Sequence, residues 1–274
     1  MKLEFQKMSG AGNDFVVADN RDGGIGDGSA LARRICDRHW GVGADGLLLL
    51  EKSTVASYKM MYYNADGSYG GMCGNGGRCI ASYAVAKGVA GSDHKFEALD
   101  HIYHAEVAEN GVRLAMKDPS ALRLGIMLPV AGKRIEGSFV DTGAPHMVVF
   151  ANRVTRKGLA AVDVLALGRA IRAHRRFRPA GTNVNFIEIG SDKFVRMRTY
   201  ERGVETETLA CGTGSIAAAI VASKIAGIRT PITVVARSKS RLMVDFEVKE
   251  EGRITNITLT GPTERVFEGK FEIR

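Results

Sequence analysis

The sequence predicts an α/β protein with two similar lobes, each a β-sheet around a buried central helix. Three observations predict this fold class. The chain has 274 residues, and at roughly 150 residues per domain this length fits two domains or one large barrel. A segment of the first half recurs in the second half, and both copies contain a stretch without charged residues, as buried helices do. Most other segments have the pattern of short β-strands.

The internal repeat is clearest at two cysteine-glycine motifs. Cys73 opens CGNGGRCIASYAVAK (73–87) and Cys211 opens the similar CGTGSIAAAIVASK (211–224), an offset of 211 minus 73, or 138 residues. Upstream, MMYYNAD (60–66) matches MRTYERG (197–203) more weakly, so that Asn64 and Glu201 occupy similar places. Each copy reads as a strand, a glycine-rich turn that begins with cysteine, and a helix. The uncharged parts of these helices, 79–86 and 216–223, are predicted to be buried.

The remaining elements follow from periodicity. Amphipathic helices are expected at 29–39 and 163–177. A break at Asp118-Pro119 divides an N-terminal lobe (1–118) from a C-terminal lobe (119–262), and Gly261-Pro262 marks a second break before a final strand. That strand could return to either lobe. With no linker-like stretch between them, the lobes are expected to be closely apposed, with the active site in the cleft. Strands are expected at 2–8, 14–19, 47–51, 112–116, 147–150, 183–188, 230–235, 242–247, 254–260 and 265–273.

Composition excludes several classes of protein. Hydrophobic residues make up 45% and charged residues 25% of the chain, which is close to the soluble globular average. No apolar run approaches the roughly 18 to 20 residues of a membrane span, and the N-terminus lacks the apolar core of a signal peptide. The four cysteines are too sparse for a disulfide scaffold. We therefore expect a cytoplasmic protein with reduced thiols, whose net charge of +8 permits anionic partners without requiring them.

The repeated cysteines carry the chemical prediction. A helix N-terminus presents unpaired N–H groups and a positive dipole end, which stabilise a thiolate and can also bind a substrate carboxylate. Two such thiols on opposite faces of a substrate carbon could remove a proton from one side and return one on the other, inverting the centre without a cofactor. An isolated cysteine is more often a small buried hydrophobe. That interpretation is expected to hold for Cys36 and Cys79.

At this point the sequence resembles the diaminopimelate epimerase family. The resemblance rests on MSGAGNDFVVADN (8–20), GVGADGLLLLE (41–51), YYNADGSYGGMCGNGGRC (62–79), GAPHMVVF (143–150), GTNVNF (181–186) and YERGVETETLACGTGSIAAA (200–219). It implies two lobes, each a barrel-like mixed sheet around a central helix, with the C-terminal strand (263–274) crossing back to the first lobe. It also implies interconversion of L,L- and meso-diaminopimelate, a diamino diacid, without pyridoxal phosphate, other cofactor or metal, in lysine and peptidoglycan precursor biosynthesis. The same resemblance is compatible with a homodimer.

The resemblance also assigns roles by position. Cys73 and Cys211 would be the acid/base pair, and His146 with Glu201 would support the thiols. Arg202 suits a carboxylate, which it can bind in a fork, and Glu201 suits an ammonium group. The full set of implied substrate-binding residues is Asn13, Asn64, Gly74, Asn75, Asn183, Glu201, Arg202, Gly212 and Thr213.

Two departures from the family pattern leave other functions open. Many members have glutamine where this chain has Gly46 and asparagine where it has Ala144. Both positions usually touch substrate, so a related amino-acid racemase with another substrate is the alternative. A thiol-based redox or binding protein that uses the same cleft is the competing class.

Other motifs are better explained without a special function. The segment GVGADG (41–46) matches a dinucleotide-binding pattern, but it follows a predicted helix and precedes a strand, the reverse of that motif. Cys73 and Cys79 are six residues apart, which is not a zinc-site spacing. The basic run RAIRAHRRFR (169–178) has no interleaved aromatics beyond Phe177, so it predicts a solvated helix face rather than nucleic-acid binding. Surface positions are expected for His39, His94, His101, His104 and His174.

Overall fold

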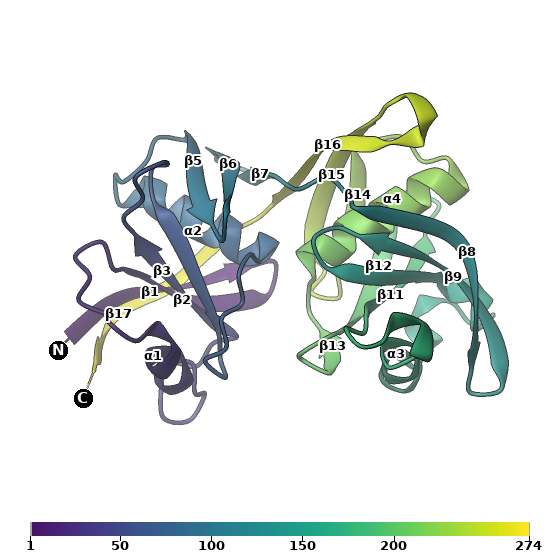
Figure 1. Cartoon of the computed structure of the whole chain (residues 1–274), viewed down its shortest axis with the longest axis horizontal. Helices are drawn as coiled ribbons and strands as arrows, with labels where there is room; N and C mark the ends of the chain where they lie inside the picture. Colours follow the sequence, from purple (N-terminus) through teal and green to yellow (C-terminus); the bar gives the residue numbers. More distant parts are fainter. Residues whose placement is uncertain (1, 274) are drawn as a thin grey trace. The chain divides into compact units, whose positions relative to one another are not determined.

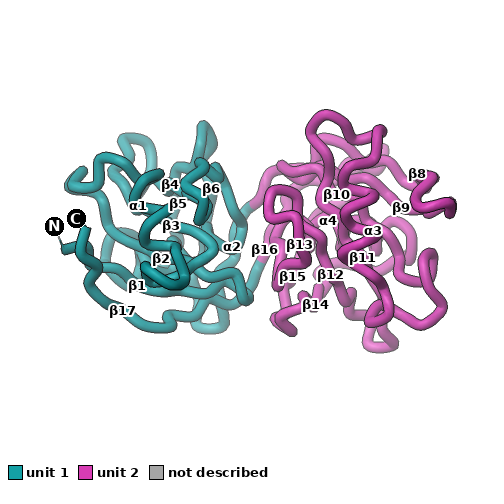
Figure 2. Tube along the Cα trace, turned by 90° about the horizontal axis from the view of Figure 1, so that it is seen from below, with its two compact units in different colours: residues 1–115, 260–274 teal, residues 116–259 magenta. Residues whose placement is uncertain are grey.

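The computed structural model describes residues 2–273 and divides the chain into two compact units. Figure 1 shows the elements along the chain, and Figure 2 shows the two units in different colours. Of the described residues, unit 1 takes 2–115 and 260–273, and unit 2 takes 116–259. Within residues 2–273, no helix has both the length and the apolar character needed to span a membrane.

Unit 1 is a mixed sheet around a central helix, α2. Its strands pair in the order of the chain: β1–β2 antiparallel, β2–β3 parallel, β3–β4 antiparallel, β4–β5 parallel, then β5–β6 and β6–β7 antiparallel. The last strand, β17, runs antiparallel to β1. The elements are β1 (Lys2–Gly10), β2 (Asn13–Asp19), α1 (Gly28–Ile35), β3 (Gly46–Glu51), β4 (Lys59–Asn64), α2 (Gly74–Ala86), β5 (Asp93–Ala98), β6 (His101–Ala108), β7 (Gly111–Ala115) and β17 (Glu264–Glu272).

Unit 2 repeats this pattern around α4. β9–β10 is antiparallel, β10–β11 parallel, β11–β12 antiparallel, β12–β14 parallel and β14–β15 antiparallel. The elements are β8 (Ala121–Val130), β9 (Lys133–Asp141), β10 (Pro145–Phe150), α3 (Val164–Arg172), β11 (Asn183–Ile189), β12 (Val195–Glu201), β13 (Thr206–Thr208), α4 (Gly212–Ala226), β14 (Ile232–Val235), β15 (Arg241–Val248), β16 (Ile254–Gly261) and the short turns η1 (Ala151–Arg153), η2 (Leu159–Ala161), η3 (Arg175–Phe177) and η4 (Glu250–Gly252).

The two uncharged helices lie where the sequence predicts, at the centre of their sheets. In unit 1, α2 contacts β1, β2, β3, β4, β6 and β7; in unit 2, α4 contacts β9, β10, β11, β12, β14 and β15. Ile216, Ile220 and Val221 of α4 are fully buried, as are Ile80 and Ala84 of α2. An apolar helix enclosed on all sides by strands explains why neither helix needs a polar face.

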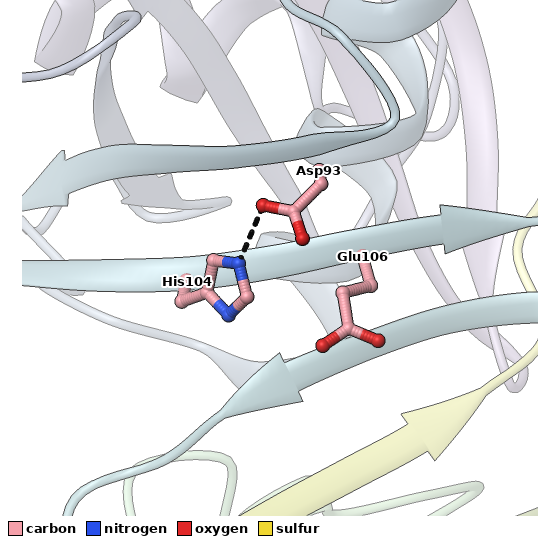
Figure 3. A group of neighbouring side chains, drawn as sticks. All are labelled: Asp93, His104 and Glu106. Carbon is pink, nitrogen blue, oxygen red and sulfur yellow. Dashed lines mark hydrogen bonds and ion pairs between the residues drawn. The ribbon is translucent and has the colours of Figure 1, made fainter.

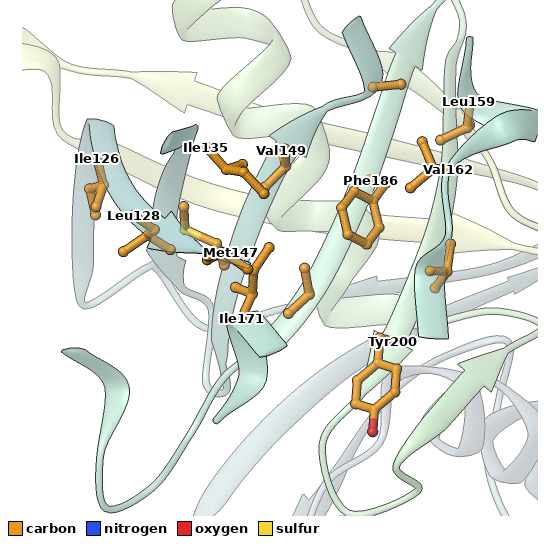
Figure 4. Close-up of a cluster of buried hydrophobic side chains, with 14 residues drawn as sticks. Ile126, Leu128, Ile135, Met147, Val149, Leu159, Val162, Ile171, Phe186 and Tyr200 are labelled. Carbon is orange, nitrogen blue, oxygen red and sulfur yellow. The ribbon is translucent and has the colours of Figure 1, made fainter. Parts of the chain in front are cut away.

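The predicted amphipathic helices form, but both are shorter than expected. α3 begins at Val164, after the N-cap Asp163, whose side chain accepts from the Ala166 N–H at 3.0 Å. The helix buries Ile171, and Leu167 is partly buried. Figure 4 shows Ile171 in the cluster of buried side chains in unit 2. The helix ends at Arg172, and η3 is a separate turn. Likewise α1 ends at Ile35, whose carbonyl accepts from the N–H groups of residues 42 and 43 as the chain turns back.

Five strands, β5, β6, β8, β9 and β13, were not expected from the sequence. β5 and β9 bury polar side chains, His94 and Ser138, and β6 and β8 expose apolar ones, Ile102 and Leu124, so these four do not alternate cleanly, while β13 has only three residues. One histidine prediction fails with them. His94 is buried on β5, where its ring nitrogens bond the Tyr58 hydroxyl at 3.2 Å and the Gly91 carbonyl at 2.7 Å. The predicted core positions of Cys36 and Cys79 are confirmed, and burial raises the pKa of each thiol to about 12.

Candidate active site

In unit 1, Cys73 caps the start of α2. Its backbone is extended (φ −125°, ψ 124°), and its sulfur accepts from the Gly76 N–H at 3.5 Å. This places the partly exposed sulfur at the positive end of the helix, among N–H groups that have no partner within the helix. The local geometry is therefore the one that the glycine-rich motif predicts for a stabilised thiolate.

An asparagine network surrounds this cysteine. Asn13, in the β1–β2 region, accepts through Oδ1 from Asn75 Nδ2 at 3.2 Å and lies 3.8 Å from the Cys73 sulfur. The Asn13 amide nitrogen donates to Asp45 Oδ2 at 2.7 Å. Because Asp45 can only accept in its ionised form, it fixes which end of the Asn13 amide faces the sulfur. Asp45, which sequence reasoning missed, is held in turn by Arg38 at 2.8 Å.

A buried arginine supports the same helix start. Arg78 has no exposed surface, and it donates to the Gly74 carbonyl at 3.1 Å and to Asn75 Oδ1 at 3.0 Å. Burial lowers the pKa of Arg78, while a negative charge on Cys79 or Cys73 would raise it. By reciprocity, the Arg78 cation favours the thiolate of Cys73. The residue stands in the quoted motif GNGGRC, but only its burial reveals this role.

The structure explains one of the two departures from the family pattern. A side-chain carbon at Gly46 would lie 2.6 Å from Cε2 of Tyr62 and 2.7 Å from the Tyr63 carbonyl oxygen. The ring of Tyr62 therefore fills the space that a larger residue would need. The Tyr62 hydroxyl donates to Asn64 Oδ1 at 2.6 Å, and Asn64 Nδ2 donates to Ser68 at 2.9 Å. The Gly46 and Tyr62 pair thus orients a predicted substrate-binding amide.

In unit 2, Cys211 caps α4 in the same extended conformation (φ −128°, ψ 113°). It is 6% exposed, and its sulfur lies 3.6 Å from the Thr213 hydroxyl. Gly214 is required here, because a side-chain carbon would lie 2.5 Å from Asn185 Oδ1. The glycine allows a polar side chain from the neighbouring strand β11 to approach the helix start.

A chain of buried polar groups leads to Cys211. Thr199 donates to Asn185 Oδ1 at 2.9 Å, and the Asn185 amide nitrogen lies 3.1 Å from His146 Nδ1. Since that nitrogen can only donate, Nδ1 of His146 accepts and its proton is on Nε2, which lies 2.9 Å from the Thr213 hydroxyl. The Thr213 proton is then left to point at the Cys211 sulfur. In this series of hydrogen bonds, His146 is therefore connected to Cys211 through Thr213.

His146 is held neutral by its surroundings. It has no exposed surface, and burial, with a smaller effect of the Arg202 cation, lowers its pKa to about 3. A neutral ring keeps the donor and acceptor arrangement above, whereas a protonated ring would have a donor facing the Asn185 amide. Protonation of His146 would therefore break the chain that leads to Cys211.

The other predicted residues of unit 2 lie at the ends of β11 and β12. Asn183 Oδ1 accepts from the Arg202 N–H at 2.8 Å, and its amide nitrogen donates to the Pro145 carbonyl at 3.2 Å. Glu201 accepts from the Thr208 hydroxyl at 2.8 Å. Asn64 and Glu201 each end a strand, β4 and β12, as their places in the repeat predict. The register of parallel strands β10 and β11 sets His146 opposite Asn183.

One further group of polar side chains, Asp93, His104 and Glu106, has the spacing of metal ligands (Figure 3). His104 bonds Asp93 at 2.8 Å, and Glu106 pairs with Arg113 at 3.4 Å. The group lies on β5 and β6 and includes none of the predicted site residues. A cation there would compete with Arg113, so we assign it no role in the site.

The fold places the chain among proteins of one architecture. A solved structure of the PhzF family, a phenazine biosynthesis protein from Bacillus anthracis, matches with a TM-score of 0.77 at 13% identity, covering 100% of both chains. A probable proline racemase from Agrobacterium radiobacter K84 matches with a TM-score of 0.75 at 17% identity, covering 99% of this chain and 93% of the other. At such identities the likeness shows the fold alone.

Sequence comparison narrows this class to a family. The family model described as diaminopimelate epimerase matches residues 5–122 and 138–266. The diaminopimelate epimerase of Aquifex aeolicus is 42% identical over 98% of this chain and 97% of its own length. That of Chlorobaculum tepidum is 43% identical over 96% and 98%. The chain belongs to the diaminopimelate epimerase family, which confirms the fold class, the resemblance and the isomerase class predicted from the sequence.

Proposed function

We propose that the protein interconverts L,L- and meso-diaminopimelate by a cofactor-independent, two-cysteine mechanism. The observation that carries this proposal is the duplicated site. In a chain of this family, Cys73 and Cys211 each cap a buried helix, next to glycines and asparagine or threonine side chains. Each thiol thus has the environment that an acid/base cysteine requires.

In this mechanism one cysteine, as thiolate, removes the α-proton, and the other, as thiol, donates a proton to the opposite face. The reverse reaction exchanges the two roles. The substrate carboxylate accepts from N–H groups at the helix starts, at Gly74 and Asn75 and at Gly212 and Thr213. These donors stabilise the negative charge that develops on the carboxylate as the proton leaves.

The polar chain in unit 2 supplies a role for His146. Because neutral His146 donates to Thr213, the hydroxyl proton of Thr213 remains available to the Cys211 sulfur. A hydrogen bond to the charged form favours the thiolate. His146 then acts as a positioning residue for Cys211, while Arg78, within α2, favours the thiolate of Cys73.

Recognition of the diamino diacid uses charged and amide groups. Arg202 binds the distal carboxylate, and Glu201 accepts from the distal ammonium. Asn13, Asn64, Asn75 and Asn183 supply further donors and acceptors, with Asn64 oriented by Tyr62. The protein would act in the cytoplasm in lysine and peptidoglycan precursor synthesis. A homodimer stays a prediction, which gel filtration with light scattering would test.

The test is to incubate the protein with L,L-diaminopimelate and a reductant in deuterated water, without added cofactor. We expect the meso isomer to form with deuterium at the inverted carbon. Cys73→Ala and Cys211→Ala should each abolish this reaction while leaving the circular dichroism spectrum unchanged. An unchanged rate in either variant would rule out the two-base mechanism.

The same experiment separates the alternatives. Deuterium exchange only on a different amino acid would support the two-cysteine mechanism but indicate a different substrate, as in a related racemase. The Gly46 and Ala144 positions motivate this alternative, although the Tyr62 ring already accounts for Gly46. Thiol oxidation without proton exchange on any amino acid would instead support the redox class.

A further inference from the structure

A cavity of about 350 Å³ lies within unit 2. This volume is within the range of roughly 300 to 1,000 Å³ that small-molecule sites occupy. Its wall contains four arginines from separate parts of the fold: one on β8, two at η3 and one directly after β12. These arginines are Arg123, Arg176, Arg178 and Arg202, and two aromatic side chains, Phe139 and Phe177, also line the cavity.

The cavity is strongly positive. Asp141 is its only acidic lining residue among those the structure describes, and it already accepts from the Gly143 N–H at 3.0 Å. Within residues 2–273, Arg123, Arg176 and Arg178 form no ion pair, whereas nearby Arg172 is paired with Glu205 at 2.8 Å. Grouped cations repel one another, so an anion bound here would relieve that repulsion.

Neighbouring groups experience this positive field. The pKa of His174 is lowered first by burial and then by the cations of residues 175, 176 and 178. Arg202 is held at the edge of the cavity by a bond from Nη1 to the Ala180 carbonyl at 3.2 Å. Part of the basic run 169–178, predicted as a solvated helix face, therefore turns toward a cavity, because α3 ends at Arg172 and η3 redirects the chain.

One wall of the cavity is flat and apolar. The rings of Phe139 and Phe177 stack with centroids 5.8 Å apart and an interplanar angle of 14°. Ile126, 6% exposed, also contributes to the lining. Guanidinium groups bind phosphate oxygens in a fork, and an aromatic wall favours a flat apolar group. We propose that this cavity binds a phosphate ester of a small, flat, apolar group.

The proposal goes beyond the proposed epimerase function and does not depend on it. One consequence does rest on that function: because Arg202 lines the cavity and is also assigned to the substrate, an occupant should raise the KM for diaminopimelate. Binding itself is measured without diaminopimelate. A failure of the epimerase proposal would therefore leave the binding result unaffected, and the reverse also holds.

The test is calorimetric titration of the full chain with phenyl phosphate at low salt. The variant Arg176→Gln/Arg178→Gln should weaken binding by about tenfold or more, since each lost charge contact removes a substantial share of the affinity. Arg175→Gln is the matched control, because Arg175 lies in the same turn but does not line the cavity. It should change affinity by less than about twofold, because exposed charges away from a ligand contribute little.

Two further ligands test the chemistry of the proposal. Inorganic phosphate should bind more weakly than phenyl phosphate if the phenylalanine wall contributes, and benzoate should bind more weakly if phosphate is the preferred anion. If the wild type bound inorganic phosphate as tightly as phenyl phosphate, the role of the phenylalanine wall would be overturned. If it bound benzoate as tightly, the preference for phosphate would be overturned. No binding to the wild type, or equal binding to the wild type and the double variant, would overturn the site itself.

Discussion

Acidification should destabilise unit 2 through His146, and the size of the effect follows from its burial. The pKa of His146 is lowered from 6.5 to about 3 in the folded chain. Below pH 6.5, His146 is protonated in the unfolded chain but stays neutral in the folded chain. The contribution of neutral His146 to the free energy of unfolding is therefore fully present above pH 6.5 and is lost as the pH falls. Between pH 7.5 and 5, the loss is about 1.5 pH units at about 1.4 kcal/mol each, or about 2 kcal/mol.

The assay is urea unfolding followed by far-UV circular dichroism, at pH 7.5 and pH 5, for the wild type and His146→Gln. The variant should be less stable at pH 7.5, because it disturbs a buried polar chain, but its loss between the two pH values should be smaller by about 2 kcal/mol. Subtracting the pH-dependent change in unfolding free energy of the variant from that of the wild type removes the contributions of other titrating groups, including His94. Equal losses in both proteins, or an NMR titration of folded His146 near pH 6.5, would refute the reasoning.

Three substitutions near the cysteines give further predictions. Tyr62→Phe removes the hydroxyl that orients Asn64 and should raise the KM for diaminopimelate by about fivefold, from loss of about 1 kcal/mol, with kcat less affected; a kcat effect alone would contradict this. Gly214→Ala places a carbon against Asn185 Oδ1 and should cost about 1 to 3 kcal/mol in urea unfolding; wild-type stability would argue against the close approach. Arg78→Met should raise the pKa of the thiol that caps α2, read as an alkylation profile displaced to higher pH; an unchanged profile would remove the electrostatic role of Arg78.

Local sequence features were sufficient to predict the core of each unit. The cysteine-glycine turns, the uncharged helices and the strands next to them are contiguous in the chain, so their pattern is visible in one window. The sequence does not predict β5, β6, β8 and β9, because buried polar side chains in β5 and β9 and exposed apolar ones in β6 and β8 interrupt the period-2 pattern. His94 was misplaced for the same reason, since its inward position depends on recognising β5.

The sequence alone determined the duplication, with one cysteine before each buried helix. Its motifs also determined the family. The tertiary structure decided which side chains surround each thiol. Asp45, Arg78 and Asn185 act through contacts with groups that the sheet or helix brings beside them, and Tyr62 acts because Gly46 on the paired strand leaves room for its ring. Strand register sets the contacts of Asn185 and Tyr62, and burial sets the surroundings of Arg78 and the pKa of His146. Neither register nor burial can be read from one segment, because each depends on residues distant in the chain.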